Sequence, residues 1–456
     1  MYDIILVNFN SIAFSKRDNC NLGLASIESY LKSQNIACVV IDYYELDKYI
    51  HLSSVFGFSV LDYSYSTAVR TTKKLKNKTV IWGGWTPSAI PEWILQNNSD
   101  VDYIILGEGE KRLEHLLLSL QQPMLFYALD GIAYRDKKNN IQVRSPQIYL
   151  DLDELPMPTD WAVMNDMVFV ELSRGCYGNC GYCQETHRMR FKSPGLIADE
   201  IESWVQRGYS NFYFGNANTL VNGKILKRLL REIERRELFL RVALVGRPDD
   251  VLRNKHILEE YFQSSHVQLS FIEVGVEANS QHLLDLLGRK TTPEINRQAV
   301  QLLLNLKSKF SSSVAIHTNI ILFSHYDMTL NELVENIKFL GEFLTCRDTL
   351  SMHLYGVSGT SIWTEMQQKG FLMQDNYGLE ITEYPFSDPY VHKIHQKIVH
   401  EPFKEATRSS KFSRYDLHNL QHKCHDIMLE FYRSNDIHKA IFDFLEQRDT
   451  QSTVQP

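Results

Sequence analysis

Three cysteines lie close together in the middle of the chain. Cys176, Cys180 and Cys183 fall within the segment CYGNCGYC, whereas the other four cysteines of the 456 residues are scattered. An odd and mostly scattered set does not resemble a disulfide framework, and clustered thiols in a reducing compartment more often hold a metal. The spacing therefore indicates a metal or redox centre in this segment.

Three kinds of site could use these cysteines. A structural zinc ion requires four ligands, and His187, which follows Cys183 after four positions, could be the fourth. A redox pair needs only two thiols in a C-x-x-C arrangement, but three are present. An iron-sulfur cluster held by three thiolates leaves one iron open, where a bound molecule can react. The residues alone leave these alternatives open.

The segments around the cysteines predict a parallel barrel. An apolar segment at 168–175 leads into the cysteines, and five more strand-like segments follow, with helical patterns between them: NFYFGNA, FLRVALVGR, VQLSFIEVGVE, VAIHTNIILF and TLSMHLYGV. Six such strand and helix units indicate a (β/α)6 partial TIM barrel over residues 165–370. Chemistry on this architecture takes place at the carboxyl ends of the strands, where the cysteines lie.

The first 125 residues predict a separate α/β domain. Apolar, β-branched segments at 3–9, 37–43, 55–60, 79–84 and 101–110 alternate with helical patterns. This order indicates a Rossmann-like sheet with a ligand crevice beyond the strand ends. The glycines at these ends either form tight turns or let a ligand approach the backbone. We expect a linker at 126–164 and a C-terminal helical region at 371–456, in which Cys424 belongs to the core.

The cysteine segment also resembles a known signature. CYGNCGYC, with an aromatic residue before its last cysteine, lies after the first strand of a six-unit series and resembles the loop of the radical S-adenosylmethionine (SAM) superfamily. The resemblance implies that Cys176, Cys180 and Cys183 ligate a 4Fe-4S cluster whose open iron is chelated by the amino and carboxylate groups of SAM. Electron transfer from the reduced cluster then cleaves SAM to methionine and a 5′-deoxyadenosyl radical.

Other segments resemble the same family in order. VGVEANS resembles the GxExxS element, which implies that Glu277 reaches the ribose of SAM and that Ser280 helps to fix it. VGRPDD resembles the R-x-D element, so Arg247 is expected at the SAM carboxylate or at the substrate, and VSGT resembles the final turn of the barrel. Tyr182, inside the cysteine segment, is also expected at SAM.

The chain departs from the family pattern after strands two and five. FGNANTLVNG stands where relatives often carry acidic residues, and ILFSHYDMT replaces a glycine-proline turn. Asn216, Asn218, His325 and Tyr326 are therefore candidates for substrate contacts. Ordinary loop residues are the alternative interpretation of each.

The N-terminal domain resembles the cobalamin-dependent branch of this family. The matching segments are LGLASIESYL, FGFS, GGWTPSAIPE and VDYIILGEGE, and no D-x-H-x-x-G segment supplies a histidine to cobalt. Thr86 stands where relatives frequently have histidine, so a sheet that persists as a scaffold without cobalamin is the alternative. The residues that the resemblance places at cobalamin are Ser59, Gly83, Gly84, Thr86, Gly107, Glu108 and Gly109.

These resemblances together predict a cobalamin-dependent radical SAM methyltransferase. It would methylate an unactivated carbon of a natural product or peptide by means of the 5′-deoxyadenosyl radical and methylcobalamin, with an external electron donor such as flavodoxin or ferredoxin. A radical SAM cyclase, ring-contraction enzyme or epimerase that transfers no methyl group is the first alternative. A zinc-stapled binding protein is the second.

The composition gives no sign of nucleic-acid binding or of a membrane span. The net charge of -7 gives no basic footprint for nucleic acid, and no apolar run of about 18 residues predicts a membrane span. We therefore expect a cytoplasmic protein that binds neither nucleic acid nor membrane.

Overall fold

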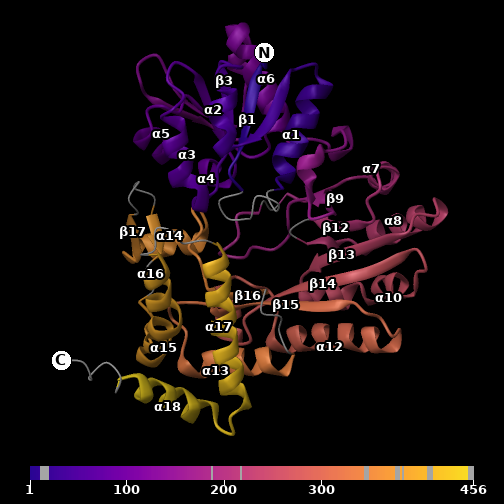
Figure 1. The fold of residues 1–456 in the computed structure, drawn as a ribbon, viewed down its shortest axis with the longest axis vertical. Coiled ribbons are helices and arrows are strands. Elements are labelled where there is room, and N and C mark those ends of the chain that lie inside the picture. Colours follow the sequence, from indigo (N-terminus) through magenta and orange to yellow (C-terminus); the bar gives the residue numbers. More distant parts are fainter. Residues whose placement is uncertain are drawn as a thin grey trace. The chain divides into compact units, whose positions relative to one another are not determined.

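The fold is shown in Figure 1 as a computed structural model. It describes residues 1–10, 20–185, 188–215, 218–343, 349–374, 380–382, 385–407 and 414–449. The chain forms two compact units. Unit 1 comprises Met1–Ser173, Arg190–Asn211 and Val357–Ile381, and unit 2 comprises Arg174–Met189, Phe212–Gly356 and Thr382–Pro456.

Unit 1 is built on a seven-stranded sheet of order β2-β1-β3-β4-β5-β6-β7. The first five strands are parallel, and β6 and β7 are antiparallel additions at one edge. The strands are β1 (Ile4–Asn8), β2 (Cys38–Asp42), β3 (Val55–Ser59), β4 (Thr79–Gly83), β5 (Tyr103–Ile105), β6 (Ile132–Arg135) and β7 (Ile141–Arg144). The strand order reverses between β1 and β3, which makes their carboxyl ends the expected ligand crevice.

Both faces of this sheet are covered. Ile5 and Val7 of β1 belong to one hydrophobic cluster, whereas Ile4 and Leu6 belong to another. Successive side chains of a strand point to opposite faces, so the apolar run IILV, residues 4–7, requires a core on each side. The helices that follow these strands are α1 (Leu22–Ser33), α2 (Leu46–Tyr49), α3 (Tyr65–Thr72), α4 (Trp85–Ala89), α5 (Pro91–Asn97) and α6 (Glu110–Gln121).

The five strands predicted for the N-terminal domain are confirmed, and two more are present. β6 and β7 lie within the residues that the sequence assigns to a linker, and β6 extends the sheet through its pairing with β5. Unit 1 also contains the antiparallel pair β8 (Val163–Met164) and β9 (Met167–Glu171), as well as α7 (Pro194–Gln206) and α14 (Ser361–Gln368).

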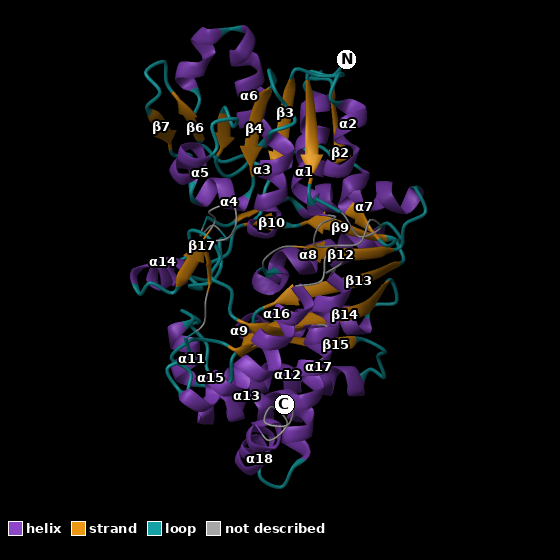
Figure 2. Cartoon of the chain, turned by 60° about the vertical axis from the view of Figure 1, so that its left-hand side comes forward, coloured by secondary structure: helices purple, strands orange, loops and turns teal. Residues whose placement is uncertain are grey.

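Unit 2 contains strands in the order β16-β15-β14-β13-β12, and Figure 2 shows β12 to β15 side by side. They are β12 (Asn211–Gly215, which begins at the boundary of unit 1), β13 (Leu240–Gly246), β14 (Val267–Glu277), β15 (Ala315–Phe323) and β16 (Leu350–His353). The pairs from β13 to β16 are parallel. Between the strands lie α8 (Gly223–Arg235), α9 (Pro248–Arg253), α10 (Lys255–Gln263), α11 (Gln281–Leu286), α12 (Pro293–Lys309) and α13 (Leu330–Glu342).

The six strands predicted for the barrel are thus present, as β9 and β12 to β16, and the α/β class is confirmed. Four short strands lie outside the two main sheets: β10 (Ser173–Arg174), β11 (Arg190–Phe191), β17 (Leu372–Gln374) and β18 (Glu380–Thr382).

Helices make up most of the described C-terminal region. They are α15 (Pro389–His395), α16 (Glu401–Thr407), α17 (Arg414–Arg433) and α18 (Ile437–Asp449). α17 packs on α13 with an apolar face that includes Met428 and Phe431. Cys424 lies on that face with no exposed surface, so its predicted place in the core is confirmed. Among the helices of the described residues, none has the length and apolar composition that a membrane crossing requires.

Candidate functional site

The cysteine loop of unit 2 folds around two glycines. Gly175 has a φ of +89°, and a Cβ there would lie 2.3 Å from the carbonyl oxygen of Arg188, so only glycine fits. A Cβ at Gly178 would lie 3.4 Å from the Cys176 sulfur and 3.6 Å from the Cys180 sulfur. Two of the three thiols therefore border the same small space over Gly178.

The turn that ends α11 supports this loop. The amide of Gly181 donates a hydrogen bond of 2.9 Å to the carbonyl oxygen of Leu287. Gly288 has a φ of +67°, and a Cβ at this position would lie 2.6 Å from the carbonyl oxygen of Asn179. The close approach of the two backbones fixes the loop against the segment that carries Arg289.

Two buried guanidinium groups face the central cysteine. The nearest nitrogens of Arg247 and Arg289 lie 3.5 Å and 3.7 Å from the Cys180 sulfur, and each side chain is 5% exposed. Arg247 follows β13 and also donates to Asp249 at 3.1 Å. Burial raises the pKa of Cys176, and the charge of Arg247 opposes that rise. Positive charge in this position favours thiolates and an anionic metal cluster.

Glu277 lies at the end of β14, close to the same arginine. Its carboxylate oxygen is 3.8 Å from a nitrogen of Arg289, which also donates to the hydroxyl of Tyr182 at 3.4 Å and to the carbonyl of Gly275. Burial raises the pKa of Glu277, whereas Arg289 and a hydrogen bond from Tyr182 oppose the rise. The structure therefore brings together the predicted residues Tyr182, Arg247 and Glu277 around Cys180.

Arg289 is the residue of this site that the sequence analysis missed. It follows the mostly apolar stretch LLDLLG and precedes Lys290, and adjacent cations at the end of such a stretch usually lie in solvent. Its contact with Cys180 spans 109 positions of the chain. The local signal was a cation after an apolar helix, with nothing to reveal its partner.

Asn218 belongs to a neighbouring polar cluster. Its amide donates to Asp250 at 2.5 Å, and Asp250 also accepts a hydrogen bond of 2.9 Å from the Tyr177 hydroxyl. The ring of Tyr177 lies under the guanidinium of Arg247, 5.2 Å from its centroid. Asn218 is thus connected to the cysteine loop through Tyr177. Asn216, the other candidate from this segment, lies outside the described residues.

The structure places the other three candidates elsewhere in unit 2. Ser280 caps α11, and its hydroxyl donates to Glu332 of α13 at 2.7 Å. His325 and Tyr326 are 0% and 1% exposed, and their rings contact each other with centroids 4.0 Å apart. This burial leaves little of either ring accessible to a substrate.

In unit 1, polar side chains gather at the ends of β1 and β3. Asn21, the N-cap of α1, donates to Asn8 at 3.0 Å and to Ser59 at 3.4 Å. Ser59 is paired in register with Gly83 at the end of β4. Ser59 was predicted, whereas Asn8 and Asn21 were missed, although Asn8 directly ends the apolar run of β1.

The predicted glycines of unit 1 differ in whether backbone conformation or a close contact excludes a side chain. Gly84 has a φ of +99° and its Cβ would lie 2.6 Å from the carbonyl oxygen of Val60, so the fold itself demands glycine. Gly107 also has a positive φ, +71°, and a Cβ at Gly109 would press on Ile27 at 2.7 Å. A Cβ at Gly83 would meet its nearest atom only at 3.7 Å, an ordinary contact. The packing of unit 1 would therefore admit a Cβ at Gly83.

Thr86 and Glu108 make contacts within unit 1. Thr86 is 1% exposed and donates to Asp62, whose carboxylate also accepts the amide of Ser358 at 3.0 Å. Glu108 pairs with Arg190 and accepts the amide of Leu150 at 3.2 Å. These two predicted cobalamin residues thus join segments of unit 1 to one another.

The cysteine site fits an iron-sulfur cluster in its chemistry. Within the part of the chain that the structure describes, no three His, Cys, Asp or Glu side chains are arranged as a ready-made metal site. The loop nevertheless supplies three thiols, two of them at the space over Gly178, and two guanidiniums that would balance an anionic cluster. His187, the candidate fourth ligand of zinc, lies outside the described residues.

Comparisons with known proteins match the part of the chain that carries this site. The family model described as the radical SAM superfamily matches residues 170–340, which include the cysteine loop. The anaerobic magnesium-protoporphyrin IX monomethyl ester cyclase of Synechocystis is 25% identical over 246 residues, which cover 51% of this chain and 48% of that protein. The 4′-phospho-dehydrooxetanocin synthase of Priestia megaterium is 23% identical over 384 residues, or 74% of this chain and 50% of that protein. The chain spans about half the length of these curated relatives.

Two solved structures share the fold over most of the chain. OxsB, a cobalamin-dependent SAM radical enzyme solved with aqua-cobalamin and SAM bound, superposes with a TM-score of 0.76 at 16% identity and covers 98% of this chain and 75% of its own. TsrM, a radical SAM methyltransferase from Kitasatospora setae solved with tryptophan and a SAM analogue, gives a TM-score of 0.65 at 16% identity and 87% coverage of both chains. The N-terminal α/β unit and the barrel strands therefore follow an arrangement known from these enzymes.

Proposed function

We propose that this chain, whose residues 170–340 match the radical SAM superfamily, is a cobalamin-dependent enzyme that methylates a carbon atom of a small molecule or peptide. The observation that carries the proposal is the arrangement around Cys180. A thiol of the signature loop, two buried guanidiniums and one buried carboxylate converge there from four separate segments of the chain. Such a set is suited to a cluster and to the zwitterionic end of SAM.

When bound, the cluster and SAM would supply the radical that removes a hydrogen atom from the substrate, and cobalamin would supply the methyl group. Cys176, Cys180 and Cys183 would hold the cluster. Arg247 and Arg289 would stabilise the Cys180 thiolate and attract the carboxylate of SAM. Since the two side chains are only 5% exposed, their charges act with little screening by water.

Glu277 and Tyr182 would orient SAM. Arg289 holds the Glu277 carboxylate from one side at 3.8 Å, so the carboxylate can accept hydrogen bonds from ribose hydroxyls in a fixed direction. The Tyr182 hydroxyl is fixed by the same arginine at 3.4 Å. A preorganised site of this kind limits the motion of a reactive intermediate.

Unit 1 would bind cobalamin at its strand ends. Gly83 supports this assignment, because a Cβ there would make only ordinary contacts, the nearest at 3.7 Å, so the packing of unit 1 does not explain the glycine. Ser59 and Asn21 offer polar groups beside it, 3.4 Å from each other. The crevice between β1 and β3 is where sheets of this order bind ligands.

A radical rearrangement without methyl transfer is the second candidate function. The similarity to 4′-phospho-dehydrooxetanocin synthase and to the cyclase favours it, since neither relative is named a methyltransferase and the two alignments cover 74% and 51% of this chain. Both candidates require an external electron donor, for which a flavodoxin or ferredoxin is suited. They differ in whether a methyl group reaches the product.

Anaerobic reconstitution followed by assay with SAM carrying a deuterated methyl group tests both candidates. We expect four irons per chain, bound corrinoid, 5′-deoxyadenosine and a labelled product; replacement of Cys176, Cys180 and Cys183 by alanine should abolish iron binding. Cys20→Ala is the matched control, because Cys20 is a half-buried cysteine of unit 1 outside the loop. Deoxyadenosine without labelled product would support the rearrangement. One zinc per chain and no iron would refute both.

A further inference from the structure

The backbone at Glu277 adopts a rare conformation. Its φ is +68°, and the amide of Ala278 donates to the carbonyl oxygen of Val276 at 2.9 Å. A hydrogen bond between residues two apart with a positive φ in the middle defines a γ-turn of the strained kind. The pairing of β14 with β15 shifts register at the same point, between Gly275 and Glu277. Strain of this sort persists only where the surroundings hold it.

Asn296 of α12 spans this turn. Its side-chain amide donates to the carbonyl oxygens of Val276 at 3.3 Å and Ala278 at 3.1 Å, the residues on either side of Glu277. The hydroxyl of Thr291 donates to the other end of the Asn296 side chain at 3.4 Å, which fixes the direction of the amide. Asn296 is 0% exposed, so water cannot replace these hydrogen bonds.

Asn336 of α13 holds the residue that follows the turn. Its side-chain oxygen accepts the amide of Asn279 at 2.8 Å. Its amide donates to the carbonyl oxygen of Leu322 at 3.0 Å and to the hydroxyl of Ser324 at 3.1 Å, at the end of β15. Asn336 is also 0% exposed. One buried side chain therefore ties the exit of β14 to the exit of β15.

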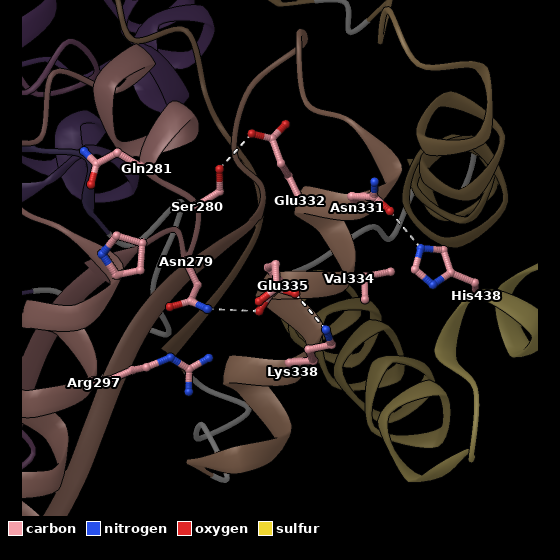
Figure 3. Close-up of a pocket in the computed structure, with 11 residues that line it drawn as sticks. Asn279, Ser280, Gln281, Arg297, Asn331, Glu332, Val334, Glu335, Lys338 and His438 are labelled. Carbon is pink, nitrogen blue, oxygen red and sulfur yellow. Dashed lines mark hydrogen bonds and ion pairs between the residues drawn. The ribbon is translucent and has the colours of Figure 1, made fainter.

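A pocket lies next to the residues that follow the turn. Asn279, Ser280 and Gln281 line a pocket of about 500 Å³ together with residues of α12, α13 and α18 (Figure 3). In this view Ser280 is bonded to Glu332, and the Asn279 amide points to the Glu335 backbone, with distances of 2.7 Å and 3.4 Å. Asn279 is 4% exposed, and hydrogen bonds to α13 hold both Asn279 and Ser280 at the edge of this pocket.

We propose that Asn296 and Asn336 are positioning residues that hold the γ-turn and thereby direct the Glu277 carboxylate toward Arg289 and Tyr182. This inference rests on the proposed function, in which Glu277 contacts SAM. Packing alone does not explain two buried asparagine side chains, since leucine would fill the same volume without the cost of burying polar groups. Their specific effect is on the direction of one carboxylate.

The test uses the full chain with its cluster reconstituted. Asn296→Asp and Asn336→Asp keep the size of the side chain but replace the donating amide with a carboxylate oxygen. If either change reduces the population of the strained turn to a tenth, the dissociation constant of SAM rises about tenfold. The measurements are SAM affinity by equilibrium dialysis and the change that SAM causes in the electron paramagnetic resonance spectrum of the reduced cluster. Iron content is expected to stay at the wild-type value.

Leu303→Ala is the matched control. Leu303 lies on α12 and is 0% exposed, so its loss lowers the melting temperature without touching the turn, and SAM affinity should not change. Thr291→Val is a milder variant that removes only the hydroxyl that orients Asn296. It should reduce SAM affinity less than Asn296→Asp does, and it replaces that variant in the test if Asn296→Asp does not fold.

The outcomes separate this inference from the proposed function. A wild-type chain that carries its cluster yet binds no SAM contradicts the proposed function. Wild-type SAM affinity and spectra in Asn296→Asp, Asn336→Asp and Thr291→Val, alongside weak binding by Glu277→Gln, would overturn the positioning role alone. A similar loss of affinity in Leu303→Ala would also overturn it, because general destabilisation would then explain the effect.

Discussion

The ion pair between Arg289 and Glu277 can be tested by removing one charge at a time. The side chains are 5% and 15% exposed, so neither charge is well solvated. At an effective dielectric constant of about 20, unit charges 3.8 Å apart attract each other by about 4 kcal/mol. Removal of one partner of a buried pair typically costs about 3–5 kcal/mol, because the other charge stays buried. We therefore expect Arg289→Met to lower the free energy of unfolding by about 3 kcal/mol.

The pH dependence of this loss has a definite sign. Burial already raises the pKa of Glu277, and Arg289 opposes the rise, so Arg289→Met raises this pKa further. A carboxyl whose pKa is raised by folding destabilises the protein where it is ionised, above that pKa. The stability difference between Arg289→Met and the wild type should thus be largest at neutral pH. It should shrink as the pH falls toward the ordinary glutamate value.

Urea unfolding of four metal-free proteins measures the coupling: wild type, Arg289→Met, Glu277→Gln and the double variant. In the Glu277→Gln background the arginine has no carboxylate to neutralise, so its removal should cost less than about 1 kcal/mol. The expected coupling is about 2 kcal/mol or more. Equal effects of Arg289→Met in both backgrounds, or a loss independent of pH, would refute the reasoning.

Two further predictions concern unit 1 and His353 of unit 2. Gly84→Ala should destabilise unit 1 by about 2 kcal/mol or more, because the φ of residue 84 is positive and a Cβ there would collide with a carbonyl oxygen. Gly83→Ala should keep the wild-type melting temperature and reduce the corrinoid bound after reconstitution. Burial, followed by the charge of His400, lowers the pKa of His353 from 6.5 to about 4, so stability should be lost as the pH falls from 6.5 toward 4. Urea midpoints at several pH values should show this loss, at most about 3 kcal/mol, and His353→Gln should reduce it.

The strands were predictable because a buried strand is a short, continuous apolar segment of the sequence. β1 is apolar from Ile4 to Val7, since both faces of the sheet are covered, and the same reasoning found the barrel strands. β6 and β7 were missed because IAYR and IQVR mix apolar and polar residues in a segment otherwise rich in turn formers. An antiparallel edge needs less burial than a central strand, so its sequence is less distinct.

The polar residues of the site were harder to predict because their partners are distant in the chain. The mutual spacing of Cys176, Cys180 and Cys183 indicated a metal or redox centre, and the family resemblance then favoured an iron-sulfur cluster. Arg289 and Asn296 carry no such local pattern, and each acquires its role only when folding brings it to a strand end that lies elsewhere in the sequence. A buried polar residue on an otherwise ordinary helix is visible in the fold and not in the composition.

Gly275 shows how closely these residues depend on one another. The Glu277 carboxylate occupies the space beside the Gly275 backbone, since a Cβ at Gly275 would lie 2.7 Å from a carboxylate oxygen of Glu277. Alternation along a strand would place residues 275 and 277 on the same face, and the γ-turn then lets the second side chain fold back over the first. Arg289 donates to the Gly275 carbonyl oxygen and forms an ion pair with the Glu277 carboxylate. Asn296 donates to the carbonyl oxygen of Val276, which lies between these two residues. The glycine provides the space, the arginine the charge and the asparagine the backbone geometry, so the direction of Glu277 follows from all three together.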